Sequence, residues 1–377
     1  MNKKTTTIAY YAAFITLGMT TAVLGPTLLT LAENANVSLA QIGVLFPTSA
    51  VGYMLGSYFS GIFYDNRPGH PQLRSYILLI VGALILFPLG EAFWMLALLA
   101  FAMGVGHGGI DVGGNTLIVW LHGKAVGPWM NGLHFMFGIG AFIAPIIVGQ
   151  LGNITWAYWT LAAIALPTAL VFIRRASPTQ PDQPDEADTR ATGASSVRLV
   201  ALLTLFLLLY VGAEVTVGGW IFSYATVQGL VNEANGSYLT SAFWGALTIG
   251  RLISIPIAMR IRPARVLFVD LLGVILSAAV ILFNRENAIL LWAGTIGLGA
   301  FMASIFPTTI NFAENRIALT GMVNRWFFIG ASLGGMSIPW LVGQFFESRG
   351  PQIMLELIIF VFLLQIALLA IVQRETA

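Results

Sequence analysis

Apolar runs long enough to cross a membrane follow one another along the whole chain, each ended by polar residues or by proline and glycine. A helix needs about 20 apolar residues to span a hydrocarbon layer roughly 30 Å thick, and the regular alternation of a membrane β-barrel is weak here. The pattern therefore predicts an all-α membrane protein with about twelve spanning helices. Their expected bounds are 8–31, 39–63, 75–90, 92–118, 128–151, 154–173, 198–224, 237–260, 264–283, 287–313, 321–346 and 351–372.

Composition supports a multi-pass protein of the cell membrane. Of the 377 residues, 57% are hydrophobic and 9% are charged, and the mean hydropathy is +0.84. A soluble domain carries about 25% charged residues. Cysteine is absent, which excludes disulfides and thiolate metal sites.

One polar segment divides the chain into six spans and six. Between Arg174 and Arg198 the sequence is rich in proline and mixed charge, without apolar periodicity, as is typical of a disordered linker. We predict an N-terminal six-helix bundle at 1–174, a cytoplasmic linker at 175–197 and a C-terminal six-helix bundle at 198–377. With both termini in the cytoplasm, most Lys and Arg residues fall on the cytoplasmic side, while Arg285 and Arg349 fall outside, as the positive-inside rule requires.

The two halves repeat each other at an offset of about 194 residues, an organisation found in transporters that rock two bundles about a midplane site. APIIVGQ at 144–150 aligns with IPWLVGQ at 338–344. Aligning GVG at 104–106 with GLG at 297–299 places Asp111 on Ser304.

Two acids lie deep inside predicted spans, and the repeat copies neither of them. Asp111 aligns with Ser304, and Glu214 aligns with Thr20. An intramembrane carboxylate costs several kcal/mol unless it is paired, protonated or hydrated, so we interpret both as part of a solute or ion pathway. The alternative is an acid held neutral or salt-bridged for folding. The glycines around Asp111, in GVGHGGIDVGGN, are interpreted as small-residue faces that let neighbouring helices approach closely or let this helix bend.

Other ionisable residues leave alternatives open. Arg251 is expected to form a structural or gating ion pair rather than to contact the solute, because its guanidinium is always charged; Asp111, Asp270 and Glu314 are possible partners. His107 and His134 suit packing as well as they suit a ligand or relay role.

The segment GIFYDNRPGHPQLR, residues 61–74, is expected to form a tight turn after the second span. In it, Asp65 and Arg67 are candidate gating residues that meet a neighbouring helix end in one conformation only. A plain solvated loop is the alternative.

Several stretches together carry a family resemblance. Gly61, Asp65 and Arg67 resemble the loop motif that follows the second helix in the major facilitator superfamily. More specific stretches resemble the branch with the sodium-dependent glucose transporters, near the fucose and galactose proton symporters; they cover 110–147, 210–225, 243–256 and 330–347.

The resemblance implies a twelve-helix facilitator fold and carriage of a sugar coupled to Na⁺ or H⁺. Asp111 matches, by its span, an acid of the fucose symporters that takes part in sugar and proton handling. Their second acid, in the first helix, has no counterpart here, where only Thr20 and Thr21 are polar candidates. Glu214 matches the Gly-Ala-Glu motif of the glucose-transporter-like branch.

We therefore predict a secondary active transporter of a small polar solute, most simply a monosaccharide, working by alternating access. Sugar recognition needs hydrogen-bonding groups beside aromatic faces. The candidate solute-binding or coupling residues are Asp111, Glu214, Asn115, His134, Trp220, Trp244, Asn311 and Asn324. Asp111 is also a candidate Na⁺ ligand; no other cofactor, no metal centre and no nucleic acid partner is expected, and a monomer in the lipid bilayer is expected.

Two other classes share parts of this pattern. An exporter of amphipathic drugs or lipids would have the same fold but would have little need of the amide and histidine candidates. A membrane sensor would more often carry a sizeable extramembrane domain. No enzyme motif is found, because GVGHGG does not follow a strand and no phosphate-binding loop or metal-ligand spacing is present.

Overall fold

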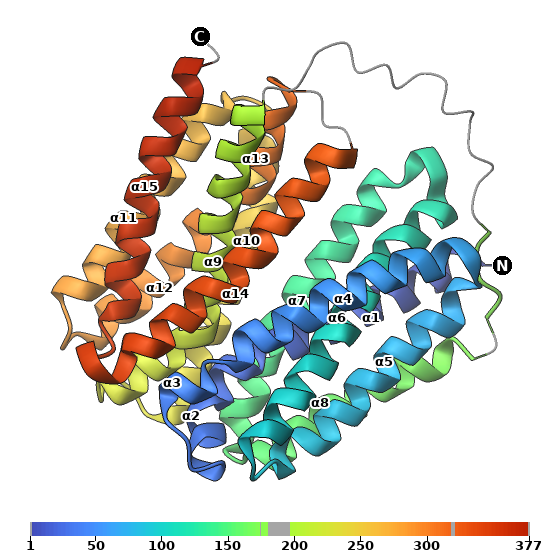
Figure 1. Ribbon diagram of the computed structural model, residues 1–377, viewed down its shortest axis with the longest axis horizontal. Helices are drawn as coiled ribbons and strands as arrows, with labels where there is room; N and C mark the ends of the chain where they lie inside the picture. Colours follow the sequence, from blue (N-terminus) through green and yellow to red (C-terminus); the bar gives the residue numbers. More distant parts are fainter. Residues whose placement is uncertain (1, 174, 180–196, 318–320, 376–377) are drawn as a thin grey trace. The chain divides into compact units, whose positions relative to one another are not determined.

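The computed structural model describes residues 2–173, 175–179, 197–317 and 321–375, and every element in these ranges is helical (Figure 1). Eleven helical segments of this described part are long and apolar enough to cross a membrane, or twelve when the bent pair α1 and α2 is counted as one span. The predicted all-α class and the number of spans are therefore confirmed. Most of the predicted linker lies outside the described residues.

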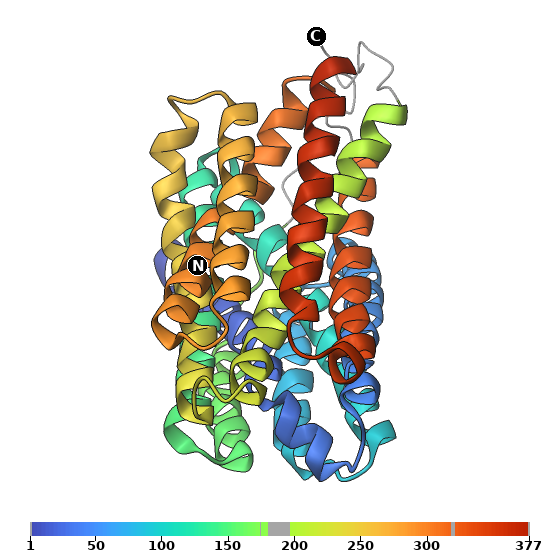
Figure 2. The same ribbon diagram turned by 90° about the vertical axis from the view of Figure 1, so that its left-hand side faces the viewer.

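The helices form two compact units. The first contains α1 (Lys3–Ala22), α2 (Leu24–Asn34), α3 (Leu39–Ile42), α4 (Leu45–Asn66), α5 (Gly69–Leu86), α6 (Phe93–His122), α7 (Gly127–Leu151) and α8 (Ile154–Val171). The second contains α9 (Val197–Val227), α11 (Pro263–Phe283), α12 (Ala288–Met302), α13 (Ile305–Glu314), α14 (Gly321–Arg349) and α15 (Ile353–Glu375), the last drawn in red in Figure 2. Helix α10 (Glu233–Ala258) contributes residues 233–241 to the first unit and the rest to the second. The domain boundaries at 174 and 198 stay a prediction.

Three predicted spans are interrupted, and a proline follows each interruption. The breaks separate α1 from α2, with a bend of 47°, α3 from α4, and α12 from α13. Proline has no N–H and its ring crowds the carbonyl four residues earlier. The prolines are Pro26, Pro47 and Pro307, and the residues four positions earlier, at the breaks, are Ala22, Gly43 and Ala303. Other helices stay continuous around an internal proline, as α7 does at Pro145, so proline permits a break without forcing one.

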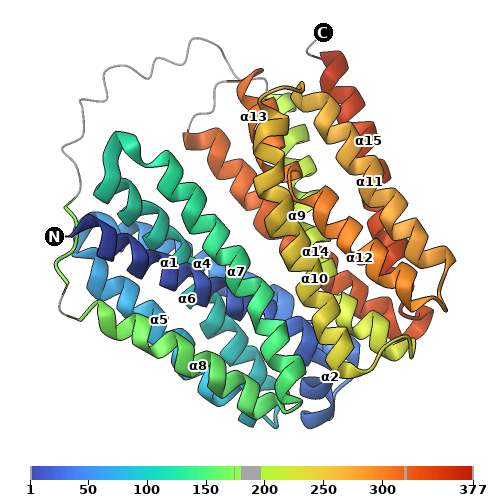
Figure 3. The ribbon, with the colours of Figure 1, turned by 180° about the vertical axis from the view of Figure 1, so that it is seen from behind.

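Glycines set how closely the helices of the first unit cross. A Cβ atom at Gly104 of α6 would overlap the carbonyl oxygen of Ser49 in α4, and one at Gly52 of α4 would overlap the carbonyl oxygen of Phe101 in α6. The interpretation of the glycine-rich segment as a close-packing face is therefore confirmed. Helices α1 and α7, seen from behind in Figure 3, cross in the same way at Gly18 and Gly140.

The second unit uses the same device where α9 and α14 run side by side (Figure 1). A Cβ at Gly334 of α14 would overlap the carbonyl oxygen of Leu208 in α9. Its neighbour Gly335 has room, because a Cβ there would meet side-chain carbons of Val215 and Val211 at 3.5 and 3.7 Å. Adjacent glycines of one helix therefore have opposite packing demands.

This contrast gives a matched pair of variants. Gly334→Ala is expected to destabilise the protein by about 1–3 kcal/mol, because an added methyl group must push α9 and α14 apart. Gly335→Ala is expected to be neutral or to stabilise by about 0.5–1 kcal/mol, because alanine is the better helix former. Thermal unfolding of both variants in the same detergent checks this, and equal melting temperatures would contradict it.

Candidate functional site

Asp111 lies near the middle of α6 and accepts hydrogen bonds from two uncharged side chains. The Tyr53 hydroxyl of α4 donates to Oδ2 at 2.5 Å, and Asn115 donates from Nδ2 to Oδ1 at 2.9 Å. Asn115 is one helical turn after Asp111 and also donates to its backbone carbonyl at 2.8 Å. Two of the predicted candidates, Asp111 and Asn115, are therefore in direct contact, and Tyr53 is an addition from a second helix.

The glycine crossing of α4 and α6 explains why Tyr53 reaches this acid. A Cβ at Gly108 would overlap the carbonyl oxygen of Tyr53, so the two backbones touch one turn before Asp111. The sequence carries one signal for this contact, namely a glycine pair spaced by four in each helix, Gly52 with Gly56 and Gly104 with Gly108. Such small-residue pairs mark helix contacts in membranes. They mark no particular tyrosine, so sequence reasoning missed Tyr53.

The two histidines of this unit contact α1. His107 of α6 is linked through Nε2 to the Thr20 hydroxyl at 2.8 Å. His134 of α7 stands edge-on to the ring of Phe14, with ring centroids 5.8 Å apart. Both contacts tie α1 to its neighbours, while a role of His134 in solute binding stays a prediction.

Glu214 and Arg251 form an ion pair within the second unit. Nη2 of Arg251 in α10 lies 3.3 Å from Oε1 of Glu214 in α9, with side chains 32% and 12% exposed. The ion pair expected for Arg251 is therefore present. Its partner is Glu214 and none of the three acids, Asp111, Asp270 and Glu314, that the sequence analysis named. Both side chains are partly shielded from solvent, and removing one member would leave the charge of the other uncompensated. This pairing agrees with the structural or gating interpretation of Arg251 and with the salt-bridged alternative for Glu214, whose role in binding or coupling stays a prediction.

The remaining candidates of the second unit have local partners. Trp220 is fully buried, donates from Nε1 to the Pro339 carbonyl at 3.0 Å and packs on Phe346. Trp244 is 5% exposed and its ring fills the space beside Gly218. These contacts are those of core residues.

Two predicted amide candidates lie at helix ends. Asn311 accepts from the Asn315 amide at its carbonyl and side-chain oxygens, at 2.8 and 2.9 Å, in the last turns of α13. Asn324 is half-buried in the first turn of α14. Their roles in binding stay predictions.

The expected turn at 61–74 is mostly helical. Helix α4 continues to Asn66 and α5 begins at Gly69, which leaves Arg67 and Pro68 between them. Arg67 is exposed, with its guanidinium carbon 5.3 Å from the centroid of the Phe63 ring. The side chain of Asp65 lies outside the described residues, so its gating role and that of Arg67 stay predictions.

Metal-binding clusters were sought among the acidic and histidine side chains. The described residues contain no group of three or more His, Cys, Asp or Glu side chains arranged to hold a metal ion.

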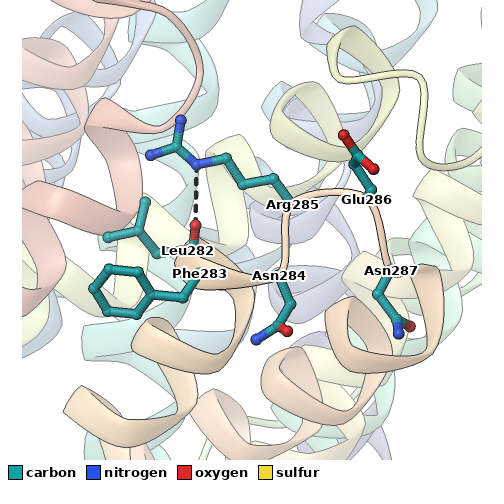
Figure 4. Close-up of a pocket in the computed structure, with 6 residues that line it drawn as sticks. All are labelled: Leu282, Phe283, Asn284, Arg285, Glu286 and Asn287. Atoms are coloured by element: carbon teal, nitrogen blue, oxygen red, sulfur yellow. Dashed lines mark hydrogen bonds between the residues drawn. The ribbon is translucent and has the colours of Figure 1, made fainter.

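Figure 4 shows a surface hollow at the connection of α11 and α12, where Arg285 donates from Nε to the Leu282 carbonyl at 3.0 Å. None of the candidate residues lines it; its lining is Leu282, Phe283, Asn284, Arg285, Glu286 and Asn287.

The chain is similar to known transporters along nearly its whole length. The family model described as Major Facilitator Superfamily matches residues 10–372. The chain is 30% identical over 373 residues to the sodium-dependent glucose transporter 1A of Mus musculus, with 88% of each chain covered.

Two solved structures share the fold at 12% identity. A bacterial homologue of the human lysosomal transporter Spinster, in an inward-facing and occupied conformation, gives a TM-score of 0.80 over 98% of this chain and 96% of its own. A D-xylose-proton symporter gives a TM-score of 0.75 over 95% of this chain and 96% of its own. With its helices long enough to span a membrane many times, the chain belongs to the major facilitator superfamily, as a multi-pass membrane transporter rather than an enzyme.

Proposed function

We propose that this transporter carries a monosaccharide by alternating access, driven by a gradient of Na⁺ or H⁺. The observation that carries the proposal is the Asp111 carboxylate, which lies inside a spanning helix and is held by two neutral donors, Tyr53 and Asn115. The similarity to a sodium-dependent glucose transporter supports the choice of substrate and of cation coupling.

Neutral partners leave chemical capacity at Asp111. A carboxylate has about four lone-pair sites, and two are engaged by Tyr53 and Asn115. The remaining sites can accept hydroxyl groups of a sugar or bind a cation. A bound cation would also neutralise the charge, which lowers the cost of keeping it within the membrane. Glu214 differs, because Arg251 already compensates its charge.

Uptake by proteoliposomes tests the substrate and the driving ion. Labelled hexoses are supplied under a Na⁺ gradient and, separately, under an H⁺ gradient. We expect one gradient to drive accumulation above equilibrium, and an ionophore that dissipates it to abolish the accumulation. Failure across a hexose panel, together with active efflux of a lipophilic dye, would favour the exporter instead.

Asp111→Asn tests the central residue. The substitution keeps the shape but removes the charge, so gradient-driven accumulation should fall by about tenfold or more, since hydrogen bonds to charged groups contribute about 1.5–3 kcal/mol. Initial uptake rates are compared at equal amounts of protein. Glu91→Gln is the matched control, because Glu91 is exposed between α5 and α6, and unchanged accumulation in Asp111→Asn would remove Asp111 from the mechanism.

Tyr53→Phe tests whether the donor from α4 acts through Asp111. Losing this hydroxyl should lower uptake by about threefold to tenfold, a smaller effect than removing the carboxylate itself. Tyr58→Phe is the control, because the Tyr58 side chain of the same helix is 66% exposed. In the Asp111→Asn background, Tyr53→Phe should cause little further loss, as expected of two directly coupled residues. Additive losses would show that Tyr53 acts elsewhere.

A further inference from the structure

A second carboxylate in a spanning helix has a hydroxyl partner in the second unit. Asp270 of α11 is half-buried, and the Ser304 hydroxyl donates to its Oδ2. Ser304 is 5% exposed and lies at the break between α12 and α13. The pair therefore joins α11 to an interrupted helix.

The break supplies further oxygen atoms beside Ser304. Pro307 has no N–H, so the Ala303 carbonyl lacks the donor that an α-helix would supply four residues later. The neighbouring carbonyl, that of Met302, accepts a hydrogen bond from Tyr210 of α9 at 2.8 Å. Interrupted helices in transporters use such carbonyls to coordinate the coupling ion.

Asp270 also differs from Glu214 in its charge balance. Arg251 pairs with Glu214 and Arg198 pairs with Glu375, and neither of these ion pairs includes Asp270. A carboxylate inside a spanning segment is costly without compensation. A cation at Asp270 would provide that compensation.

The internal repeat relates the pair Asp270 and Ser304 to Asp111 of the first unit. Ser304 is the position that aligns with Asp111, and the sequence comparison alone leaves the second half without an acid there. In the structure, α11 brings the Asp270 carboxylate to Ser304. Each unit thus has a carboxylate with a hydroxyl donor at this repeat position, from Tyr53 to Asp111 in the first and from Ser304 to Asp270 in the second.

We propose that Asp270, Ser304 and the carbonyl groups of the α12–α13 break bind Na⁺. Carboxylate, hydroxyl and carbonyl oxygens are the ligands that hard cations prefer. Sodium binding breaks the hydrogen bond from the Ser304 hydroxyl to Asp270, and the hydroxyl keeps its proton while its oxygen turns toward the ion. As the coupling site of the transporter, this assignment rests on the proposed function; as a binding site it stands without sugar.

Sodium binding to the purified protein tests the site, measured with ²²Na⁺ in the absence of any sugar. Asp270→Asn should abolish saturable binding, and Ser304→Ala should raise the dissociation constant by about tenfold, which corresponds to about 1.4 kcal/mol. Ser277→Ala is the matched control, because its hydroxyl in the same helix α11 donates to the Gly273 carbonyl, and it should bind Na⁺ as the unmodified protein does.

Thermal unfolding provides a second readout that also verifies folding. A ligand that binds the folded state raises its stability, so NaCl should raise the melting temperature of the unmodified protein and of Ser277→Ala relative to choline chloride. Asp270→Asn should unfold cooperatively without this rise. Unchanged Na⁺ binding in folded Asp270→Asn, or the absence of Na⁺ binding in a protein that accumulates hexose on an H⁺ gradient, would overturn the site. Sodium binding without hexose uptake would overturn the proposed substrate and leave the site standing.

Discussion

Direct contact between helix backbones at glycine is the constraint on which both units depend. Lipid offers no hydrophobic force to hold apolar helices together, so the helices depend on van der Waals contact at close range. Gly104 and Gly108 let α6 touch the backbone of α4, and Gly334 lets α14 touch that of α9. At such a distance the polar side chains of one helix reach those of the next. The hydrogen bond from Tyr53 to Asp111 follows from the first of these crossings.

Glu214, Asp111 and Asp270, three acids of spanning helices, differ in whether a positive charge already balances theirs. Glu214 is matched by a fixed positive charge on Arg251, so its negative charge is already balanced. Asp111 and Asp270 accept from hydroxyl or amide donors, which orient a carboxylate without neutralising it. A site that must bind and release a cation needs the second arrangement, because a permanent guanidinium would compete with the cation. Pairing chemistry therefore separates these acids better than burial does.

Sequence reasoning predicted the spans and the close-packing glycines, because both are properties of a single helix. It predicted an ion pair at Arg251 because an unpaired charge inside a membrane is costly. It missed Tyr53, and it considered Asp270 only as a possible partner of Arg251, not of Ser304. Both depend on which faces of two helices meet, and rotation about a helix axis is set by packing that hydropathy does not record. The break before Pro307 was equally hidden, since Pro145 sits in a continuous helix.

The repeat shows how one scaffold can carry unlike chemistry. Aligning the halves residue by residue compares the same helix of each bundle, and at Asp111 and Ser304 it finds an acid replaced by a hydroxyl. In the structure, the Ser304 hydroxyl contacts a carboxylate of a different helix, that of Asp270 in α11. The second unit, which has a serine in place of the acid, thus has a carboxylate next to this position that comes from a neighbouring helix. Two units of similar helices then present carboxylates with different neighbours, one beside a tyrosine and an amide, the other beside a helix break.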